Sequence, residues 1–153
     1  MSIDARLHEL GLSIPKLPPP VASYVPAVRV GNLVWVSGAT PTVDGVLTIT
    51  GKLGEEVSLE EGQQAARLSA LNCLANAMAV IGSLEDIARI VKLNGYVASA
   101  EGFVDQPKVI NGASDLFEEI FGESGKHARA ALGVAELPGG APVEVEMTLE
   151  LKS

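Results

Sequence analysis

Arg129 is the residue of this 153-residue chain with the most evident chemical purpose. It lies in residues 128–132 (ARAAL), a strand-like run of otherwise small or apolar side chains. A guanidinium is a permanent cation with a planar fork of donors, and among alanines it is expected to meet an anion. Glu144 and Glu146 follow in the next segment and offer carboxylates. From the residues alone, a structural ion pair and a contact with a ligand's anion explain Arg129 equally well.

The other reactive side chains predict less chemistry. His8, His127 and Cys73 lack the spacing of metal ligands, so we expect no metal site. Cys73 lies in an alanine-rich helical pattern and is interpreted as a packed core residue. Ser37 precedes a glycine, but its surroundings do not form a nucleophile elbow. The sequence therefore carries no pattern for metal or serine-nucleophile catalysis.

The C-terminal segment must position Arg129 and the two glutamates. Apolar residues alternate strictly with polar ones over 143–151, which predicts a strand with one buried and one polar face. Glu144 and Glu146 share the polar face, where solvent exposure is the default for a carboxylate. Residues 138–140 (PGG) are a turn signal between this strand and the one that carries Arg129. We therefore expect the last two strands to lie side by side.

Further strands are predicted upstream. Residues 24–30 and 33–37 are rich in β-branched and aromatic side chains and flank a two-residue Gly-Asn turn, which is typical of a hairpin. Pro26 marks the first of these strands as an edge or bulged strand. Residues 46–49 form a short apolar run after an Asp-Gly turn, and residues 87–98 form a longer β-compatible segment.

Two longer helices are predicted between and after these strands. Residues 58–61 (SLEE) have the form of a capping box and begin an apolar stripe that runs to Gly82. The second helix is expected from Pro107 to Phe121, with the proline in its first turn. The order of elements is two or three strands, a helix, a strand, a helix and two strands, which indicates an α+β protein.

The first 23 residues are predicted to be a unit of their own. Ser2 begins a short helix that Gly11 ends. Four prolines in residues 15–20 then exclude both a helix and a strand ladder. A rigid surface arm is one interpretation, and an arm lying across a pocket or a neighbouring subunit is the alternative. We expect an N-terminal helix and arm over 1–23 and one domain over 24–153.

Composition excludes several classes of function. The chain has 47% hydrophobic and 20% charged residues, as expected for one globular domain. Its formal net charge of −8 and its scattered basic residues disfavour nucleic acid and acidic membranes as partners. A single cysteine suits a reducing compartment. We expect no signal peptide and no membrane span, and we predict a cytoplasmic location.

Several segments together resemble the Rid family, the reactive intermediate deaminases, which are also called YjgF-like or L-PSP endoribonuclease-like proteins. Residues 128–129, 134–138 and 143–146 are similar to the family's C-terminal signature. Residues 24–25 before the hairpin, 36–38 at its end and 111–117 on the second helix match in the same order. The resemblance covers about 24–151 and is greatest to a longer branch with an N-terminal extension.

The resemblance implies an α+β fold like that of chorismate mutase. A mixed β-sheet would carry two helices on one face, and three copies would form a homotrimer whose sheets make a central β-barrel. Ligand sites would lie in clefts between subunits. Two helices are too few to cover both faces of a sheet, so assembly would bury the second face.

The resemblance also implies a reaction and the residues that perform it. Arg129 would hold the carboxylate of a 2-imino acid or its enamine tautomer, which is hydrolysed to a 2-oxo acid and ammonia as in a 2-iminobutanoate/2-iminopropanoate deaminase. Glu144 would orient water and move protons. Tyr24 and Asn111 would shape the pocket, and Gly38 would allow close approach of the backbone. No metal or organic cofactor is implied.

Two departures from the family pattern keep other functions open. Ala131 stands where a cysteine is common, so only its backbone carbonyl is left to hold water, and Ala39 replaces a frequent glutamine. One alternative is therefore a small-carboxylate-binding or sensor protein that does not turn its ligand over. An endoribonuclease is a third possibility, which the acidic composition and the lack of a His/Lys catalytic set disfavour.

Overall fold

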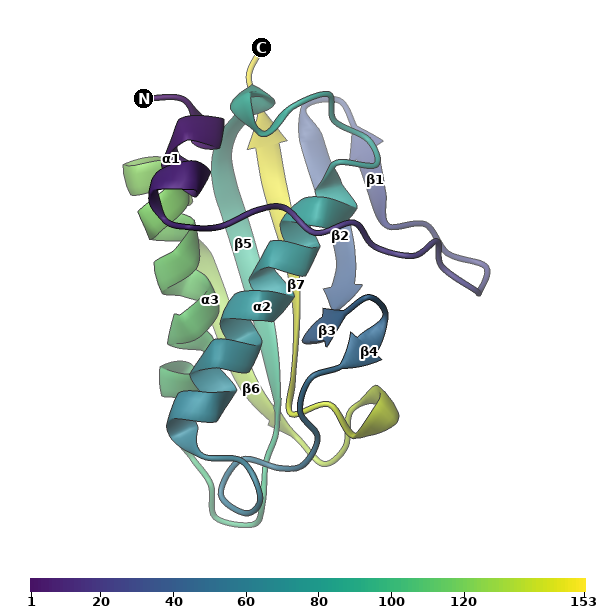
Figure 1. Ribbon diagram of the computed structural model, residues 1–153, viewed down its shortest axis with the longest axis vertical. Helices are drawn as coiled ribbons and strands as arrows, with labels where there is room; N and C mark the ends of the chain where they lie inside the picture. Colours follow the sequence, from purple (N-terminus) through teal and green to yellow (C-terminus); the bar gives the residue numbers. More distant parts are fainter.

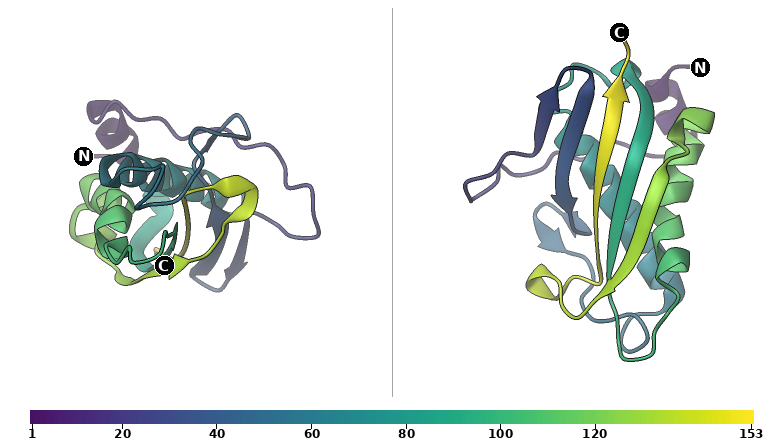
Figure 2. Two further views of the ribbon diagram at one scale, coloured as in Figure 1. Left: turned by 90° about the horizontal axis from the view of Figure 1, so that it is seen from below. Right: turned by 180° about the vertical axis from the view of Figure 1, so that it is seen from behind.

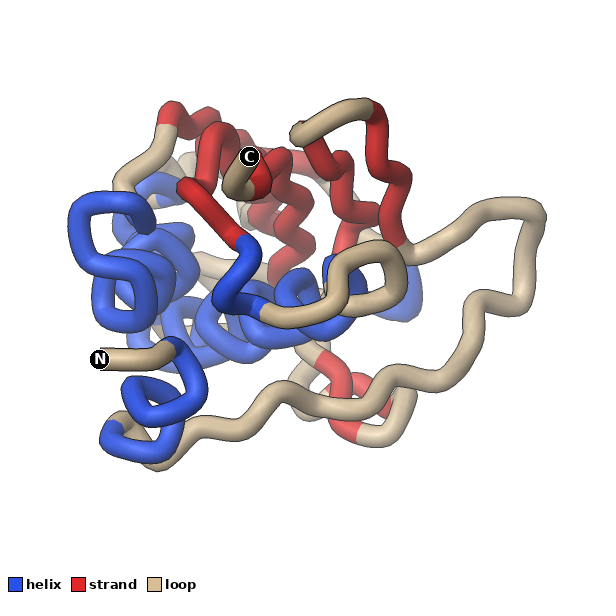
Figure 3. Tube along the Cα trace, turned by 90° about the horizontal axis from the view of Figure 1, so that it is seen from above, coloured by secondary structure: helices blue, strands red, loops and turns tan.

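The computed structural model describes all 153 residues as two layers, with a β-sheet on one side and helices on the other (Figures 1 and 3). The sheet order is β1-β2-β7-β5-β6, and a separate small hairpin is formed by β3 and β4. All neighbours in the sheet are antiparallel except β5 and β6, so the sheet is mixed as predicted. The strands are β1 (Ala27–Val30), β2 (Leu33–Ala39), β3 (Thr42–Val43), β4 (Val46–Leu47), β5 (Ile87–Ala98), β6 (Ala128–Val134) and β7 (Val143–Leu151).

The prediction that the last two strands lie side by side was wrong, because β5 lies between β6 and β7. The helix between β5 and β6 returns the chain so that these two strands run parallel and adjacent, as in a β-α-β unit. The 12-residue β5 then pairs with β7 along its other edge. Residues 135–142 carry the chain across the end of β5, and the PGG turn is part of this longer connection.

The predicted helices are present with small shifts at their ends. They are α1 (Ile3–Glu9), α2 (Leu59–Ala77) and α3 (Gln106–Phe121), with single 3-10 turns η1 (Leu84–Asp86), η2 (Gly122–Gly125) and η3 (Pro138–Gly140). The capping box is confirmed, since Ser58 and Glu61 each accept a hydrogen bond from the other's backbone N–H. α2 ends before Gly82 because residues 78–80 continue only as hydrogen-bonded turns.

The helices α2 and α3 cover one face of the sheet, and the other face is bare (Figure 2). The alternation in β7 explains this asymmetry, since all five apolar residues of Val143–Leu151 are buried under the helices. The bare face carries Val28, Trp35 and Leu132, each about half exposed. Val28 and Trp35 are cross-strand partners, so their exposed apolar side chains are neighbours, and a contiguous apolar patch of this kind is typical of an interaction surface. None of the helices is both long enough and apolar enough to cross a membrane.

Gly112 sets the distance between the two covering helices. A Cβ atom at this position would lie 2.0 Å from the backbone carbonyl oxygen of Gln63 in α2. Because backbone atoms cannot move aside as a flexible side chain can, only glycine permits this approach of α3 to α2. The contact matters for the site, since Asn111 and Ser114 lie on either side of Gly112 in α3.

We expect Gly112→Ala to lower the free energy of unfolding by about 2–4 kcal/mol, because the new methyl group must push α3 away from α2. Alanine otherwise favours a helix over glycine, so helix propensity alone predicts the opposite sign. Urea denaturation measures the change. Gly82→Ala is the control, since a Cβ there meets its nearest neighbour at 3.5 Å, an ordinary contact. Equal stability of both variants and the wild type would contradict the packing argument.

Candidate functional site

Arg129 lies on the edge strand β6 and its side chain reaches over α3. It pairs with the buried Leu93 of β5 and therefore points to the helix-covered side of the sheet. Its Nη1 donates to Oδ1 of Asn111 at 2.7 Å and to Oγ of Ser114 at 3.1 Å. The two acceptors are one helical turn apart, so α3 presents both to the same nitrogen.

Within the chain no carboxylate neutralises Arg129, so neither Glu144 nor Glu146 of the same chain forms the structural ion pair that the sequence left open. None of the ion pairs in the structure includes Arg129, and its Nε and Nη2 have no protein acceptor. The guanidinium borders a pocket of about 290 Å³ whose lining is entirely polar or charged: Asn111, Ser114, Asp115, Glu118, Lys126, His127 and Arg129. The part of the donor fork that is not bonded to protein is free to bind an anion.

Sequence reasoning missed Ser114 and His127, which belong to the same group of side chains. Ser114 Oγ lies 2.9 Å from Nε2 of His127, and Nδ1 of His127 lies 2.6 Å from the carbonyl oxygen of Gly125. Burial lowers the pKa of His127, the hydrogen bond to Gly125 opposes this effect, and the charge of Arg129 adds to it. The i,i+3 spacing of Asn111 and Ser114 was a signal that could have identified the serine, since both lie on one helix face.

Glu144 and Gly38 form a second group on the bare face of the sheet. A Cβ atom on Gly38 would lie 3.1–3.3 Å from the carboxyl end of Glu144, so a larger residue would crowd this carboxylate. Gly38 lies where the pairing of β2 with β7 shifts register, which is where a bulge re-aims the chain. Burial, and then the charge of Glu146, raises the pKa of Glu144.

Glu146 is already engaged within the protein and is the less available of the two carboxylates. Its Oε1 accepts hydrogen bonds from the Tyr96 hydroxyl at 2.6 Å and from Nδ2 of Asn94 at 3.2 Å. The bond to Glu146, together with burial, raises the pKa of Tyr96 to about 12, so the phenol stays a donor. Glu144 has no such partner, which makes it the freer carboxylate for chemistry.

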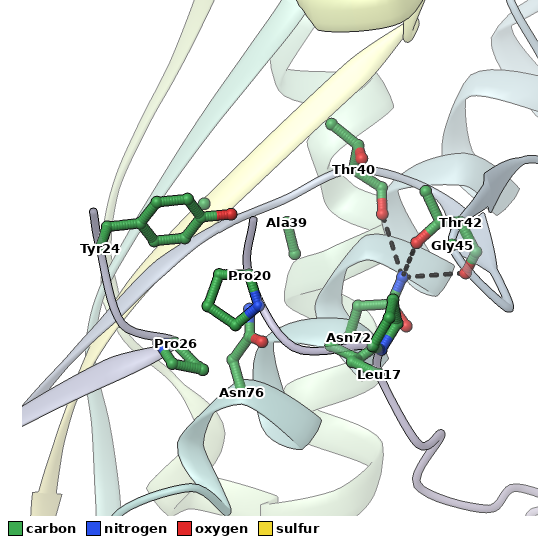
Figure 4. Close-up of a pocket in the computed structure, with 12 residues that line it drawn as sticks. Leu17, Pro20, Tyr24, Pro26, Ala39, Thr40, Thr42, Gly45, Asn72 and Asn76 are labelled. Atoms are coloured by element: carbon green, nitrogen blue, oxygen red, sulfur yellow. Dashed lines mark hydrogen bonds between the residues drawn. The ribbon is translucent and has the colours of Figure 1, made fainter. Parts of the chain in front are cut away.

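Tyr24 and Gly38 line a pocket of about 150 Å³ at the end of β2 (Figure 4). The proline-rich arm supplies one wall through Leu17, Pro18 and Pro20, and α2 supplies Asn72 and Asn76. Asn72 is almost fully buried, and its Nδ2 donates to the carbonyls of Thr40 and Thr42. The arm therefore lies across a pocket, as the alternative interpretation of the prolines held.

Within one chain the predicted residues fall into two separate groups. Arg129 and Asn111 lie together on the helix side, and Glu144, Gly38 and Tyr24 lie together near β2. The sheet register pairs Arg129 of β6 with Leu93 of β5, and Leu93 with Met147 of β7. Glu144 therefore lies two strands away from Arg129 across the sheet, and three residues further along β7. Strand geometry makes this separation about 14 Å between Cα atoms, with the side chains on opposite faces.

Ala131 lies on the same side of β6 as Arg129 and packs against the hydrophobic core. Cys73 is fully buried, as predicted for a packed residue, and its thiol contacts the carbonyl of Val145. Burial raises the pKa of this thiol, so the reactive thiolate is disfavoured. The structure contains no group of three or more His, Cys, Asp or Glu side chains that could share a metal ion.

Comparison with known proteins gives the family. A family model described as "YjgF/chorismate_mutase-like, putative endoribonuclease" matches residues 4–147. The chain belongs to this YjgF-like family, the Rid proteins. The chorismate-mutase-like α+β fold that the resemblance implied is confirmed, with a mixed sheet and three helices.

Individual relatives cover most of the chain. Protein TCP17 of Trypanosoma cruzi is 43% identical over 99% of this chain and 95% of its own length. A Dermatophagoides farinae protein named 2-iminobutanoate/2-iminopropanoate deaminase is 33% identical over 88% of this chain and 91% of its own length. The crystal structure of Atu1372 from Agrobacterium tumefaciens, a protein of unknown function, has a TM-score of 0.89 and 45% identity, and the match covers 99% of this chain and 92% of that chain.

The raised pKa of Glu144 predicts that this residue costs stability. The folded state holds the proton more tightly than the unfolded state, so stability is lost as the pH rises from the ordinary glutamate range through the folded pKa. We expect Glu144→Gln to stabilise the protein at about pH 7 by roughly 0.5 kcal/mol, a value reduced for partial solvent screening, and to have no effect near pH 4.

Urea denaturation at fixed protein concentration tests this expectation. Glu150→Gln is the matched control, because Glu150 lies on the same face of the same strand. Its neighbour on that face is Thr148, whereas the neighbour of Glu144 is the acidic Glu146. A loss of stability in Glu144→Gln at neutral pH would show that the carboxylate is held by favourable contacts instead.

Proposed function

We propose that this Rid protein hydrolyses 2-imino acids, or their enamine tautomers, to 2-oxo acids and ammonia. The reaction adds water across the C=N bond of R–C(=NH)–COO⁻ and gives R–C(=O)–COO⁻ and NH₃. The observation that carries the proposal is the guanidinium of Arg129, which is held only by neutral acceptors beside a polar pocket. A cation that its own protein leaves uncompensated is suited to a substrate carboxylate.

In this proposal Arg129 orients the substrate and Glu144 manages protons. A bidentate grip on the carboxylate fixes the adjacent C=N carbon for attack by water. A glutamate whose pKa is raised exchanges a proton closer to neutral pH than an ordinary one, which suits a residue that orients water and protonates the departing nitrogen. The substrate is already electrophilic at carbon, so these groups are sufficient without a cofactor.

The proposal requires that two copies of the chain share each site. Arg129 and Glu144 are too far apart, and on opposite faces, to act on one small molecule within a single copy. The bare sheet face, with exposed Trp35, Val28 and Leu132, supplies apolar surface for assembly. We therefore propose the homotrimer with a central β-barrel, in which the Arg129 group of one subunit meets the Glu144 group of its neighbour.

A carboxylate-binding protein without turnover is the second candidate. The observation that favours it is Ala131, which stands at the position of a common family cysteine and packs against the core. A ribonuclease, which the family description mentions, is not proposed, because a net charge of −8 opposes the binding of a polyanion.

We expect Arg129→Ala to lower kcat/KM for a 2-iminopropanoate-type substrate by at least about 100-fold, because it removes the group that orients the carboxylate. The assay follows the loss of the imine with semicarbazide as a trap for the substrate that remains. Arg29→Ala is the control, since Arg29 is an exposed arginine on β1 outside both groups. Wild-type protein that binds pyruvate but does not accelerate imine loss would favour the second candidate.

Mixing two variants, each expected to be inactive alone, tests whether two subunits share the site. Arg129→Ala and Glu144→Gln subunits that are denatured and refolded together should regain about a quarter of wild-type activity, because random assembly pairs an intact arginine with an intact glutamate at that frequency. Each variant refolded alone is the control. Activity that stays at the level of the separate variants would place both residues of a working site in one chain.

A further inference from the structure

A chain of hydrogen bonds connects the backbone of η2 to the guanidinium of Arg129. Nδ1 of His127 lies 2.6 Å from the carbonyl oxygen of Gly125, and Nε2 lies 2.9 Å from Ser114 Oγ. The serine oxygen is in turn 3.1 Å from Nη1 of Arg129. These contacts make His127 the only titratable side chain linked to Arg129 by hydrogen bonds.

The Gly125 carbonyl decides how the hydrogen atoms are arranged. A carbonyl oxygen can only accept, so Nδ1 of His127 carries the hydrogen and Nε2 of the neutral ring is an acceptor. The hydroxyl of Ser114 must then donate to Nε2. The lone pairs of the Ser114 oxygen remain free to accept the hydrogen bond from Nη1 of Arg129. This arrangement holds while His127 is neutral.

The imidazole is also fixed in space. Its ring meets the ring of Phe117 edge-on, with centroids 5.9 Å apart. A Cβ atom on Gly125 would lie 2.1 Å from the carbonyl oxygen of Phe117, so only glycine lets η2 come close enough to present its carbonyl to the ring. Phe117 and Gly125 therefore hold the His127 ring in one position beside α3.

We propose that His127 is a positioning residue for Arg129, and that through Ser114 it couples carboxylate binding at Arg129 to the uptake of a proton. This inference rests on the proposed function in that it takes Arg129 as the carboxylate-binding group. It adds a role for two residues that neither the resemblance nor the reaction assigns.

Protonation of His127 changes what the site offers to an anion. The imidazolium donates from Nε2, so Ser114 becomes the acceptor for both His127 and Arg129. The hydroxyl hydrogen of Ser114 is released and can point into the pocket towards a bound carboxylate. The added positive charge also attracts the anion, while the anion offsets the repulsion between Arg129 and the imidazolium. Each event therefore favours the other.

Other charged side chains lie around His127 on α3, η2 and β5. Asp115 and Glu118 on α3 line the same pocket, but neither is hydrogen-bonded to Arg129, Ser114 or His127. Lys126 is paired with Glu123 at 2.8 Å and with Glu118 at 3.7 Å, and Nη2 of Arg89 on β5 donates to the carbonyl of Lys126. Of these groups, only His127 is linked to Arg129 by hydrogen bonds, and proton uptake on ligand binding is therefore assigned to His127.

A nucleophilic role for Ser114 is a weaker explanation of the same contacts. Ser114 lies inside α3, where the backbone N–H groups are used in the helix and cannot form an oxyanion hole. Its oxygen also accepts from Arg129, which withdraws the electron pair that a nucleophile needs.

The test measures pyruvate binding by calorimetry between about pH 5.5 and about pH 8, where the pyruvate carboxylate stays ionised. We expect wild-type affinity to increase about three- to tenfold as the pH falls, with proton uptake visible as a dependence on the buffer's ionisation enthalpy. His127→Leu should weaken binding at the higher pH by about fivefold, the value of one hydrogen bond, and should remove the pH dependence.

Two variants separate positioning from general structure. His127→Gln places an amide oxygen where it can accept from Ser114, so it should rescue much of the affinity lost in His127→Leu while binding stays independent of pH. His8→Gln removes the only other histidine and should leave the pH profile unchanged. Long-range ¹H–¹⁵N NMR spectra should show His127 protonated at Nδ1 in the free protein.

The outcomes distinguish the two proposals. Pyruvate binding that depends on Arg129 but is the same at every pH, or is unaffected by His127→Leu, overturns the role of His127 and leaves the proposed function standing. Absence of pyruvate binding to the wild type at every pH overturns the carboxylate site itself, and this inference with it.

Discussion

The parallel pairing of β5 with β6 across α3 is the constraint on which the candidate site depends. It makes β6 an edge strand and lays α3 directly beside it, so an arginine of β6 can reach only helix side chains and solvent. Antiparallel pairing of β6 with β7 would instead have placed Arg129 next to a strand that carries four polar residues. The topology keeps the cation away from Glu144 and Glu146, and this separation is what leaves its charge available.

The same sheet has two features that are unfavourable for the stability of a single chain. Glu144 is half-buried beside another glutamate, and the bare face exposes Trp35 among other apolar side chains. A monomer gains nothing from either feature, because a buried carboxylate disfavours folding and exposed apolar surface favours aggregation. Both become useful if a second copy covers the face and a substrate meets the carboxylate. Unfavourable local features of this kind are expected where stability has been exchanged for function.

Local patterns in the sequence predicted local structure well and pairing less well. The alternation in β7, the capping box of α2 and the apolar stripe of α3 depend on residues close in sequence, and all three are confirmed. The neighbour of β6 was mispredicted because a proline-glycine turn signals a reversal but does not say how many strands the reversal crosses. The handedness and adjacency of β-α-β units carried the missing information.

The candidate site was also predicted only in part from the sequence. Arg129 stands out in the sequence because its neighbours are small and apolar, whereas Ser114 and His127 do not, because serine on a helix and a single histidine are ordinary residues. Their significance arises from contacts between α3, η2 and β6 that no single segment reveals. Because Arg129 is bonded only to neutral groups, its positive charge is not compensated within the chain. One of these groups, Ser114, is also bonded to His127, so the direction of its hydrogen bond can change with pH. The chemistry of the site therefore depends on the partners of Arg129 as much as on the arginine itself, and those partners follow from the fold.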